Sequence, residues 1–339
     1  MWPKVSFVIP TLNSEKVIRT CIDSIITQDY DPNLVEIVIS DGGSKDRTLE
    51  ILRSYKCYIN IVSNPLKTGE AGKAVGIRAS IGDYIALIDS DNVLPNRDWL
   101  KQMIEPLINT SDAVGSEPWK FEWRATDGFI DRYCALMGMN DPICYFIGNY
   151  DRVNVISGKW TNVPHTQQEY ENYIVASFSK DGIPTIGANG TVFRSSFLKN
   201  ALNSDYLFDI DILAQTIYEQ GSVSFIKVKN SIIHNYCGSD IGKFIRKQRR
   251  RINDLMYYRE INARKYNWGF QTTGISIFIF ESLLVFPLIA QSIMGYAKKP
   301  DTAWFFHPIA CWIGLVINTY GVIFAQIKPQ IQNRTNWSQ

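Results

Sequence analysis

The sequence has no strong excess of charge of either sign. Its 35 Lys and Arg residues nearly balance its 33 Asp and Glu residues, which leaves a formal net charge of +2 over 339 residues. A general electrostatic attraction to nucleic acid is therefore not indicated, and we expect no nucleic-acid partner. The hydrophobic share of 45% and the charged share of 20% are typical of a globular protein with some membrane character.

Paired cysteines are also missing. The six cysteines are scattered, and none of them forms a C-x-x-C pair or has the spacing of a zinc finger. We interpret them as free thiols of a reducing compartment. We also expect no secretory signal, because residues 1–10 lead directly into the pattern of a strand.

A glycine-rich turn is absent from the place where a dinucleotide-binding domain would carry it. The first predicted strand, Val5–Ile9, is followed by Pro-Thr-Leu-Asn at residues 10–13 and not by Gly-x-Gly-x-x-Gly. This absence argues against a nicotinamide-dependent dehydrogenase.

The first third of the chain instead contains a regular alternation of strand and helix patterns. The predicted strands are residues 5–9, 36–40, 58–62 and 84–88, and the predicted helices are residues 14–27, 46–55 and 72–80. Such alternation predicts an α/β, Rossmann-like fold with a mostly parallel central sheet and helices on both faces. Sites in such sheets lie beyond the carboxyl ends of the strands.

The strongest chemical signal is a strand that delivers two carboxylates at its carboxyl end. Residues 85–88 are apolar, and Asp89 and Asp91 follow them. Carboxylate oxygens are ligands for Mg²⁺ or Mn²⁺, and such an ion would neutralise a departing nucleotide diphosphate. A polar turn after a strand is the alternative, since D-x-D alone is common by chance.

With these motifs the chain resembles the family 2 inverting glycosyltransferases, which have the nucleotide-sugar-binding A-type fold. Val8–Asn13 is similar to the family's opening strand and Pro-x-x-Asn turn. Ile37–Thr48 is similar to its second strand and Asp-x-x-Ser-x-Asp-x-Thr turn. The resemblance covers about residues 4–235.

The resemblance implies roles for the residues at the strand ends. Asp41 would contact the base or ribose, Asp89 would lie near the ribose and metal, and Asp91 would be a ligand of Mn²⁺ or Mg²⁺. The further nucleotide contacts would be the turn residues after the first strand: Pro10, Thr11 and Asn13. As alternatives, Asn13 and Asp41 could simply form turns, and Ser44 and Asp46 could cap the following helix.

One glycine-spaced segment departs from the family pattern. Lys73 stands where the family has an arginine, and Ala74 stands where it has an asparagine. Lys73 could contact the diphosphate as a point charge. A solvated surface lysine is the alternative.

The predicted acceptor side begins at residues 119–173, which we interpret as irregular helices and loops that shape an acceptor cleft. Gly187–Arg194, in a predicted strand or bend over residues 183–193, resembles the family's Gly-x-Asn-Gly segment. Asp209 opens a predicted helix at the position of the family's general base, with Phe208 in place of a glutamate. Asp211 is the rival base, because residues two apart on a helix do not share a face. Helix capping is the alternative role of Asp209.

Three further residues carry weaker signals. His234 follows a short predicted strand at 231–233, where the family often places a histidine near the metal, and it could complete the metal shell. The alternative is a structural histidine. Gln248–Ile252 resembles the Gln-x-x-Arg-Trp motif of processive synthases, with isoleucine at the tryptophan position. Gln248 and Arg251 could contact the diphosphate or the acceptor.

The C-terminal third predicts membrane attachment. Residues 241–270 predict a basic amphipathic interfacial helix, or alternatively a solvated surface helix. Residues 271–328 predict two membrane helices, at 272–296 and 302–327, or alternatively two interfacial helices that never cross. The basic run before them favours the cytoplasmic face. The predicted domains are a catalytic domain (1–240, with halves 1–115 and 116–240), the interfacial helix, the membrane helices and a tail (329–339).

Together these features predict an inverting hexosyltransferase at the cytoplasmic face of the cell membrane. The donor would be a nucleotide-diphospho-sugar, UDP-linked first and GDP-linked next. The acceptor would be a polyprenyl phosphate, a polyprenyl-diphosphate-linked saccharide or a growing surface glycan, with membrane lipid as a further partner. Two other hypotheses stay open. The first is a processive synthase, against which stand the small number of candidate spans and the missing tryptophan. The second is a catalytically silent membrane-bound binding or scaffold protein, against which stand the retained Asp89, Asp91 and Asp209.

Overall fold

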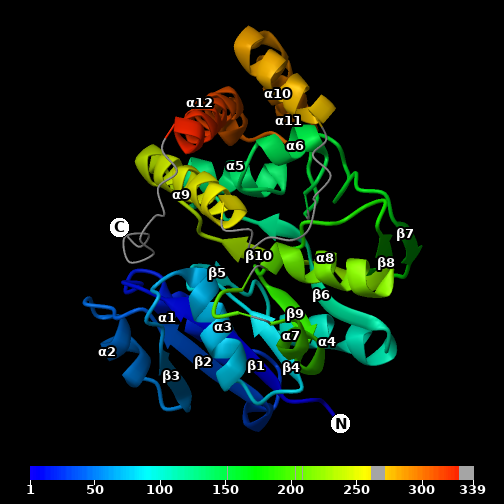
Figure 1. The fold of residues 1–339 in the computed structure, drawn as a ribbon. Coiled ribbons are helices and arrows are strands. Elements are labelled where there is room, and N and C mark those ends of the chain that lie inside the picture. The colour runs from blue at the N-terminus through cyan, green and yellow to red at the C-terminus, as the bar shows by residue number, and fades with distance from the viewer. Residues whose placement is uncertain (151, 203, 208, 261–271, 328–339) are drawn as a thin grey trace. The chain divides into compact units, whose positions relative to one another are not determined.

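Four short apolar segments form the parallel strands that the sequence predicts. The computed structural model describes residues 1–327 except 151, 203, 208 and 261–271. Its first strands are β1 (Val5–Thr11), β2 (Val35–Asp41), β3 (Ile59–Ser63) and β4 (Tyr84–Leu87), in the spatial order β3-β2-β1-β4 (Figure 1). Every residue of β1 and β4 is buried, as expected for strands that helices cover on both faces.

Helices connect these strands and pack closely on the sheet. They are α1 (Ile18–Ile26), α2 (Thr48–Arg53), α3 (Gly69–Ala79) and α4 (Trp99–Asn109). In α3, a Cβ atom at Gly72 would lie 2.8 Å from Cβ of Pro10, and one at Gly76 would collide with Val8. Glycine at both positions therefore lets α3 lie directly on β1.

The sheet continues with antiparallel strands, which corrects the prediction of a mostly parallel sheet. The full order is β3-β2-β1-β4-β9-β6-β10-β8-β7, with β5 paired to β10. β9 runs antiparallel to β4 and β6, and β8 runs antiparallel to β10 and β7. These strands are β5 (Asn92–Val93), β6 (Ala113–Glu122), β7 (Thr166–Glu169), β8 (Tyr173–Ser179), β9 (Thr191–Arg194) and β10 (Ser222–His234).

β10 is one strand of 13 residues, although the sequence predicts two short strands at 223–227 and 231–234. The polar residues between them suggest a break. In the structure Lys227 is fully buried and pairs with the buried carboxylate of Glu117 at 2.5 Å. The ion pair lets a charged residue remain inside a buried strand.

The described residues divide into two units, each made from two segments of the chain. The first unit comprises Met1–Trp119 and Pro164–Ile233 and also contains α7 (Ser195–Ala201) and α8 (Asp209–Gln220). The second comprises Lys120–Val163 together with residues 234–327. These borders differ from the predicted ones at 115 and 240, because residues 120–163 pack with the C-terminal helices.

The second unit is helical, and it includes helices in a segment that the sequence predicts as irregular. Its helices are α5 (Phe129–Met137), α6 (Ile143–Ile147), α9 (Ile241–Glu260), α10 (Thr272–Leu284), α11 (Phe286–Lys298), the short 3₁₀ helix η2 (Thr302–Phe306) and α12 (His307–Ile327). Its core joins Tyr133 and Phe244, both packed edge-on against Phe306, with the buried Trp304.

The predicted membrane helix over residues 272–296 is in fact two helices. α10 and α11 meet at an angle of 96°. Val285 lies between them with a positive φ of 65°, and Pro287 occupies the first turn of α11, where its missing N–H costs nothing. In the part of the chain that the structure describes, no single helix combines the length and apolar character that crossing a bilayer requires, and only this bent pair does so jointly.

Candidate active site

The ends of β1 and β2 form the first part of the site. Thr11 and Asp41 are paired in register at the last positions of these strands. The buried Asp41 carboxylate accepts hydrogen bonds from Thr11 Oγ1 (3.1 Å), Gly43 N (2.8 Å), Ser44 N (2.9 Å) and Ser44 Oγ (2.6 Å). Each carboxylate oxygen thus accepts two hydrogen bonds, and three of the four donors belong to the turn at residues 43–44.

A second turn, after β1, is tied to this one. Asn13 has a left-handed backbone (φ 51°), which asparagine tolerates. The backbone amide of Asn13 donates to Ser44 Oγ at 2.9 Å, and its side-chain oxygen accepts from Lys45 N at 2.9 Å. Asp46 precedes the N-cap residue Arg47, and its carboxylate accepts from Thr48 N, at the first residue of α2, at 3.0 Å. Ser44, predicted as a possible helix cap, instead bonds to Asp41 and Asn13.

Lys73 is not the solvated surface lysine that the sequence allowed. It lies on α3 with 7% of its surface exposed, and its Nζ lies 2.7 Å from Oδ1 of Asp89. Close packing of α3 on β1 carries this ammonium to the carboxyl ends of the strands. A buried cation thus sits directly beside the first residue of the D-x-D motif.

The structure brings Asp89, Asp91 and His234 together, as the sequence predicts. Each offers one ligand atom, and these atoms all lie within 4.8 Å of one another. The sheet explains the meeting, because β5 starts at Asn92, directly after Asp91, and pairs with β10, which ends at His234. Two carboxylates and one imidazole are a donor set that fits Mn²⁺ well and Mg²⁺ less well.

Cys21 lies behind the carboxylates and was not predicted as part of the site. Its thiol points to the backbone oxygen of Asp89 at 3.7 Å. Burial first, and the negative charges of Asp91 and Asp89 next, raise the pKa of Cys21 well above its usual range. The residue therefore stays a neutral thiol that packs under the motif. Its only sequence signal is its place on the apolar stripe of α1.

The predicted acceptor segment lies beside the D-x-D strand. Thr191 of β9 is in register with Leu87, the last residue of β4, and the Gly190 amide donates to the Leu87 carbonyl at 2.9 Å. The Gly-x-Asn-Gly segment thus lies at the edge where β4 leads into Asp89.

The helix with the two candidate bases starts near the same place. The amide of Leu207, just before α8, donates to the carbonyl of Glu70 in the first turn of α3 at 3.1 Å. Asp209 is the first residue of α8, but its side chain lies outside the part of the chain that the structure describes. Phe208 also lies outside it. Asp211 is described and buried.

Gln248 and Arg251 lie on α9 in the second unit. Gln248 is buried and donates to the carbonyl of Asn140 at 2.6 Å. Arg251 donates to the side-chain oxygen of Gln248 at 3.3 Å and lies 3.5 Å from the carboxylate of Asp141. Both residues therefore hold the 140–141 loop against α9, and their predicted contact with a diphosphate or acceptor stays a prediction.

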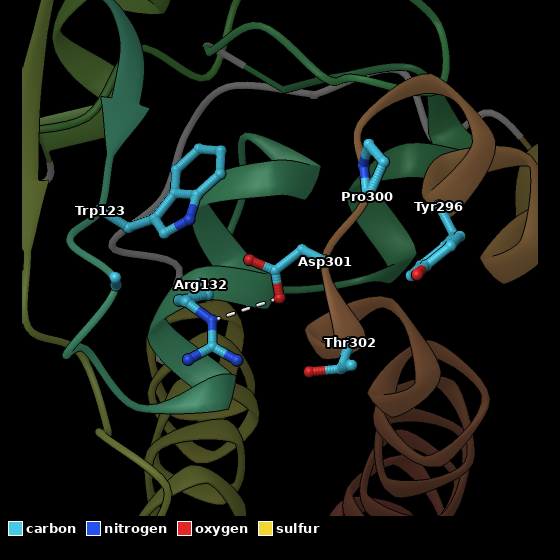
Figure 2. A pocket seen from close by; sticks show the side chains of 7 residues that line it. Trp123, Arg132, Tyr296, Pro300, Asp301 and Thr302 are labelled. Atoms are coloured by element: carbon cyan, nitrogen blue, oxygen red, sulfur yellow. Dashed lines mark hydrogen bonds and ion pairs between the residues drawn. The ribbon is translucent and has the colours of Figure 1, made fainter.

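The second unit also contains a surface pocket of about 480 Å³. Figure 2 shows Trp123 on one side, Tyr296 and Pro300 on the other, and the ion pair of Arg132 and Asp301 (3.2 Å) between them. Aromatic faces next to a paired guanidinium and carboxylate are suited to a ligand with both apolar and hydroxyl-rich surfaces. Trp123 belongs to the segment from which the sequence predicts an acceptor cleft.

Comparison with known proteins places the first part of the chain in a family. Residues 6–132 match the family model for glycosyl transferase family 2. The poly(ribitol-phosphate) β-N-acetylglucosaminyltransferase TarS of Staphylococcus aureus is 32% identical over 102 residues, which are 29% of this chain and 18% of TarS. The dolichyl N-acetyl-α-D-glucosaminyl phosphate 3-β-D-2,3-diacetamido-2,3-dideoxy-β-D-glucuronosyltransferase of Methanococcus voltae is 34% identical over 106 residues, 30% of this chain and 33% of that protein. The chain thus spans at most about a third of the length of these two relatives.

A solved structure shares the fold of this chain. The mannosyltransferase PcManGT from Pyrobaculum calidifontis, in complex with GDP-Man and Mn²⁺, superposes with a TM-score of 0.52 at 15% identity. The match covers 94% of this chain and 88% of PcManGT. The α/β fold with a mixed central sheet is therefore shared with this transferase. The family match itself shows a glycosyl transferase family 2 domain over residues 6–132, which confirms for these residues the resemblance drawn from the motifs.

Proposed function

We propose that the protein is an inverting glycosyltransferase that moves a sugar from a nucleotide-diphospho-sugar to a lipid-linked or membrane-associated glycan. The observation that carries the proposal is the meeting of Asp89 and Asp91, which lie within the residues that match the family 2 model, with His234 at the end of β10. The two curated relatives support it by their names, which describe sugar transfer to poly(ribitol-phosphate) and to a dolichyl-linked sugar phosphate.

Asp89, Asp91 and His234 would hold a divalent ion, Mn²⁺ or Mg²⁺. When bound, such an ion supplies positive charge that stabilises the leaving nucleotide diphosphate. Lys73 supports the same task, because its buried ammonium already stands beside Asp89 and can offer a fixed positive charge to a diphosphate oxygen. UDP-sugars are the first donors to test, and GDP-sugars are the second, since PcManGT was solved with GDP-Man.

The nucleotide would lie over the two turns at the ends of β1 and β2. Pro10, Thr11 and Asn13 form one turn, and Asp41 fixes the other through its four hydrogen bonds. For Asp41 to contact a base or ribose directly, a hydroxyl of the nucleotide must replace one of these donors. The exchangeable partner is the Ser44 hydroxyl, since a side-chain hydroxyl can turn away from the carboxylate without moving the backbone.

Asp209 would act as the general base on the acceptor hydroxyl. It would take the proton while the acceptor oxygen attacks the anomeric carbon from the side opposite the diphosphate, which inverts that carbon. Asp211 is the alternative base. The hydrogen bond between Leu207 and Glu70 supports this placement, because it brings the start of α8 to the helix that carries Lys73.

The pocket at Trp123 would contact a sugar of the acceptor. An indole ring can cover the apolar face of a sugar ring, while Arg132 and Asp301 can bond to its hydroxyls.

We further propose that the protein works at the cell membrane with its catalytic domain in the cytoplasm. The exposed apolar side chains of α10 to α12 and the basic helix α9 support this location.

The proposed function is tested by a screen of nucleotide sugars in the presence of membrane lipid extract, with and without Mn²⁺. Released nucleotide is the readout. We expect one donor to be consumed only when Mn²⁺ is present. Asp209→Asn should abolish transfer and preserve donor binding, whereas Asp112→Asn, a change at an exposed residue, should have no effect. Full activity of Asp209→Asn would disprove the assignment of the base, and no turnover of any donor would disprove the function.

A further inference from the structure

We propose that the second unit binds the surface of an anionic lipid bilayer through α10, α11 and α12, which enter one leaflet without crossing the membrane. The proposal concerns the mode of attachment and the kind of lipid, and it does not depend on glycosyl transfer. The surface consists of the large exposed apolar side chains of these helices and of η2: Ile277, Ile279, Phe280, Leu283, Leu284, Phe286, Ile289, Ile293, Met294, Tyr296, Phe305, Ile309, Trp312, Val316 and Tyr320.

The large apolar side chains of this surface are strongly exposed. Phe286 is 81% exposed, and Phe280 and Leu283 are each 62% exposed. Most large apolar side chains that are exposed in the described chain lie on these three helices. Large apolar side chains exposed in such number on neighbouring helices indicate a binding face for a membrane or a protein.

Several polar residues of the same helices are buried or half-buried and bond to one another, which favours lipid over water outside. Tyr133 Oη lies 2.8 Å from Nδ1 of the buried His307, whose Nε2 lies 2.7 Å from Oε1 of Gln291. Gln291 in turn donates to Glu281 at 2.7 Å. Ser292 is also buried. A helix that faces water exposes mainly polar side chains, whereas these helices expose large apolar ones and bury part of their polar ones.

Both ends of the bent pair rest on the same part of the second unit. At the start of α10, Gly274 lies so close to Phe146 that a Cβ atom would meet its carbonyl oxygen at 2.5 Å. At the end of α11, Lys298 donates to the carbonyl of Ile156 at 2.5 Å. Since both contacts are made with residues 120–163, the chain returns to the side from which it left. The bend of 96° between the helices suits insertion into one leaflet.

The charge pattern selects an anionic bilayer over an apolar protein partner. Residues 241–260, which form α9, contain seven Lys and Arg and two Asp and Glu. α9 packs on α12, where a Cβ atom at Gly321 would meet Ile252 at 2.7 Å. A basic helix beside an apolar face is the combination that binds anionic headgroups and acyl chains together. The exposed Trp312 and Tyr320 suit the headgroup region.

Flotation with sealed vesicles tests the surface. We expect the full-length chain to float with vesicles of phosphatidylcholine and phosphatidylglycerol, and to bind pure phosphatidylcholine at least about tenfold more weakly. Phe280→Asp combined with Phe286→Asp should reduce partitioning by about tenfold or more. The matched control, Tyr58→Asp combined with Ile81→Asp, changes exposed apolar residues of the first unit and should bind like the wild type. Equal flotation of the two double variants, or self-association without vesicle binding, would overturn the proposal.

A labelling experiment tests whether the helices cross. Ala297 is exposed near the end of α11, and Cys57 is exposed in the first unit. We expect a membrane-impermeant maleimide to label Ala297→Cys, in a Cys57→Ser background, from the same side of a sealed membrane as it labels native Cys57. Labelling from opposite sides would show a crossing and contradict insertion into one leaflet.

Discussion

The pair formed by Lys73 and Asp89 is the residue-level feature on which the donor site depends most. The Lys73 ammonium is buried, and the Asp89 carboxylate 2.7 Å away compensates its charge where water is largely excluded. The same ammonium can turn toward a diphosphate when a divalent ion takes over the carboxylate. Asp89 would thus be neutralised both before and after the donor binds.

Replacement of Lys73 by methionine should weaken donor binding. The variant keeps the length of the side chain but removes its charge, so we expect donor affinity to fall by about tenfold or more, because a charged hydrogen bond contributes about 1.5–3 kcal/mol. Titration calorimetry at saturating Mn²⁺ measures the change.

The surface pair of Lys101 and Asp29, 2.6 Å apart, provides the control. Lys101→Met should leave donor affinity unchanged and should hardly alter the free energy of unfolding, since exposed pairs contribute little. If Lys73→Met bound the donor as tightly as Lys101→Met does, Lys73 would have no role in donor binding.

At the residue scale, the sequence predicted the ligand group better than its surroundings. Asp89, Asp91 and His234 could be named because their residue types and places after strands carry the signal. The partner of Lys73 could not be named, because it depends on how closely α3 approaches β1. The four donors around Asp41 and the thiol behind Asp89 were missed for a similar reason, since they depend on turn geometry and on burial.

At the scale of elements, the close contact of α3 with β1 holds the site in place. Gly76→Ala would insert a methyl group against Val8 and Ser40. We expect a loss of about 1–2 kcal/mol in the free energy of unfolding, because overpacking outweighs the better helix propensity of alanine.

Gly69→Ala is the matched control in the same helix. Its Cβ would have its nearest neighbour, Cγ of Pro10, at 4.0 Å, which is an ordinary contact. Denaturant unfolding of both variants should show a loss for Gly76→Ala and none for Gly69→Ala. Equal stability of the two would mean that α3 does not lie directly on β1.

The helices of the second unit carry a pH dependence through His307. Burial lowers the pKa of His307 to about 4, from an ordinary value near 6.5. Above about pH 6.5 the imidazole is neutral in both the folded and unfolded chain. Between about pH 6.5 and pH 4 only the unfolded chain takes up the proton, so stability is lost as the pH falls, by about 3 kcal/mol in all. Below about pH 4 the loss is complete.

His307→Gln should flatten this part of the pH profile of stability, whereas replacement of the half-buried His165 by glutamine should not. Thermal unfolding at a series of pH values measures the effect. An unchanged profile in His307→Gln would contradict the assignment of the pH dependence to this residue.

The elements themselves were predicted where local pattern decides structure. The alternating strands and helices before residue 90 have clear apolar periods, and they were found with errors of a few residues at their ends. The continuity of β10 was missed because Lys227 is buried by an ion pair with a residue 110 positions away. Pro287 lies within the predicted membrane helix, but the position of the sharp bend at Val285 depends on packing that the local sequence does not contain.

At the scale of the whole molecule, the chain builds its two units from alternating segments. Residues 120–163 join the C-terminal helices instead of the sheet that precedes and follows them. Local sequence patterns carry no information about such long-range pairing, so the predicted borders at 115 and 240 differ from the observed ones. The family match over residues 6–132 concerns mainly the first unit, whereas the proposed membrane surface and the pocket at Trp123 belong to the second.

The central claim is that Asp89, Asp91 and His234 form a site for a divalent ion that binds together with the nucleotide diphosphate. Electron paramagnetic resonance of Mn²⁺ in the presence of UDP or GDP measures this directly, because bound Mn²⁺ loses the spectrum of the free ion. We predict tight binding by the wild type and by Asp98→Asn, a change at an exposed residue, and binding at least about tenfold weaker by Asp91→Asn. Equal Mn²⁺ affinity of Asp91→Asn and the wild type would contradict the account.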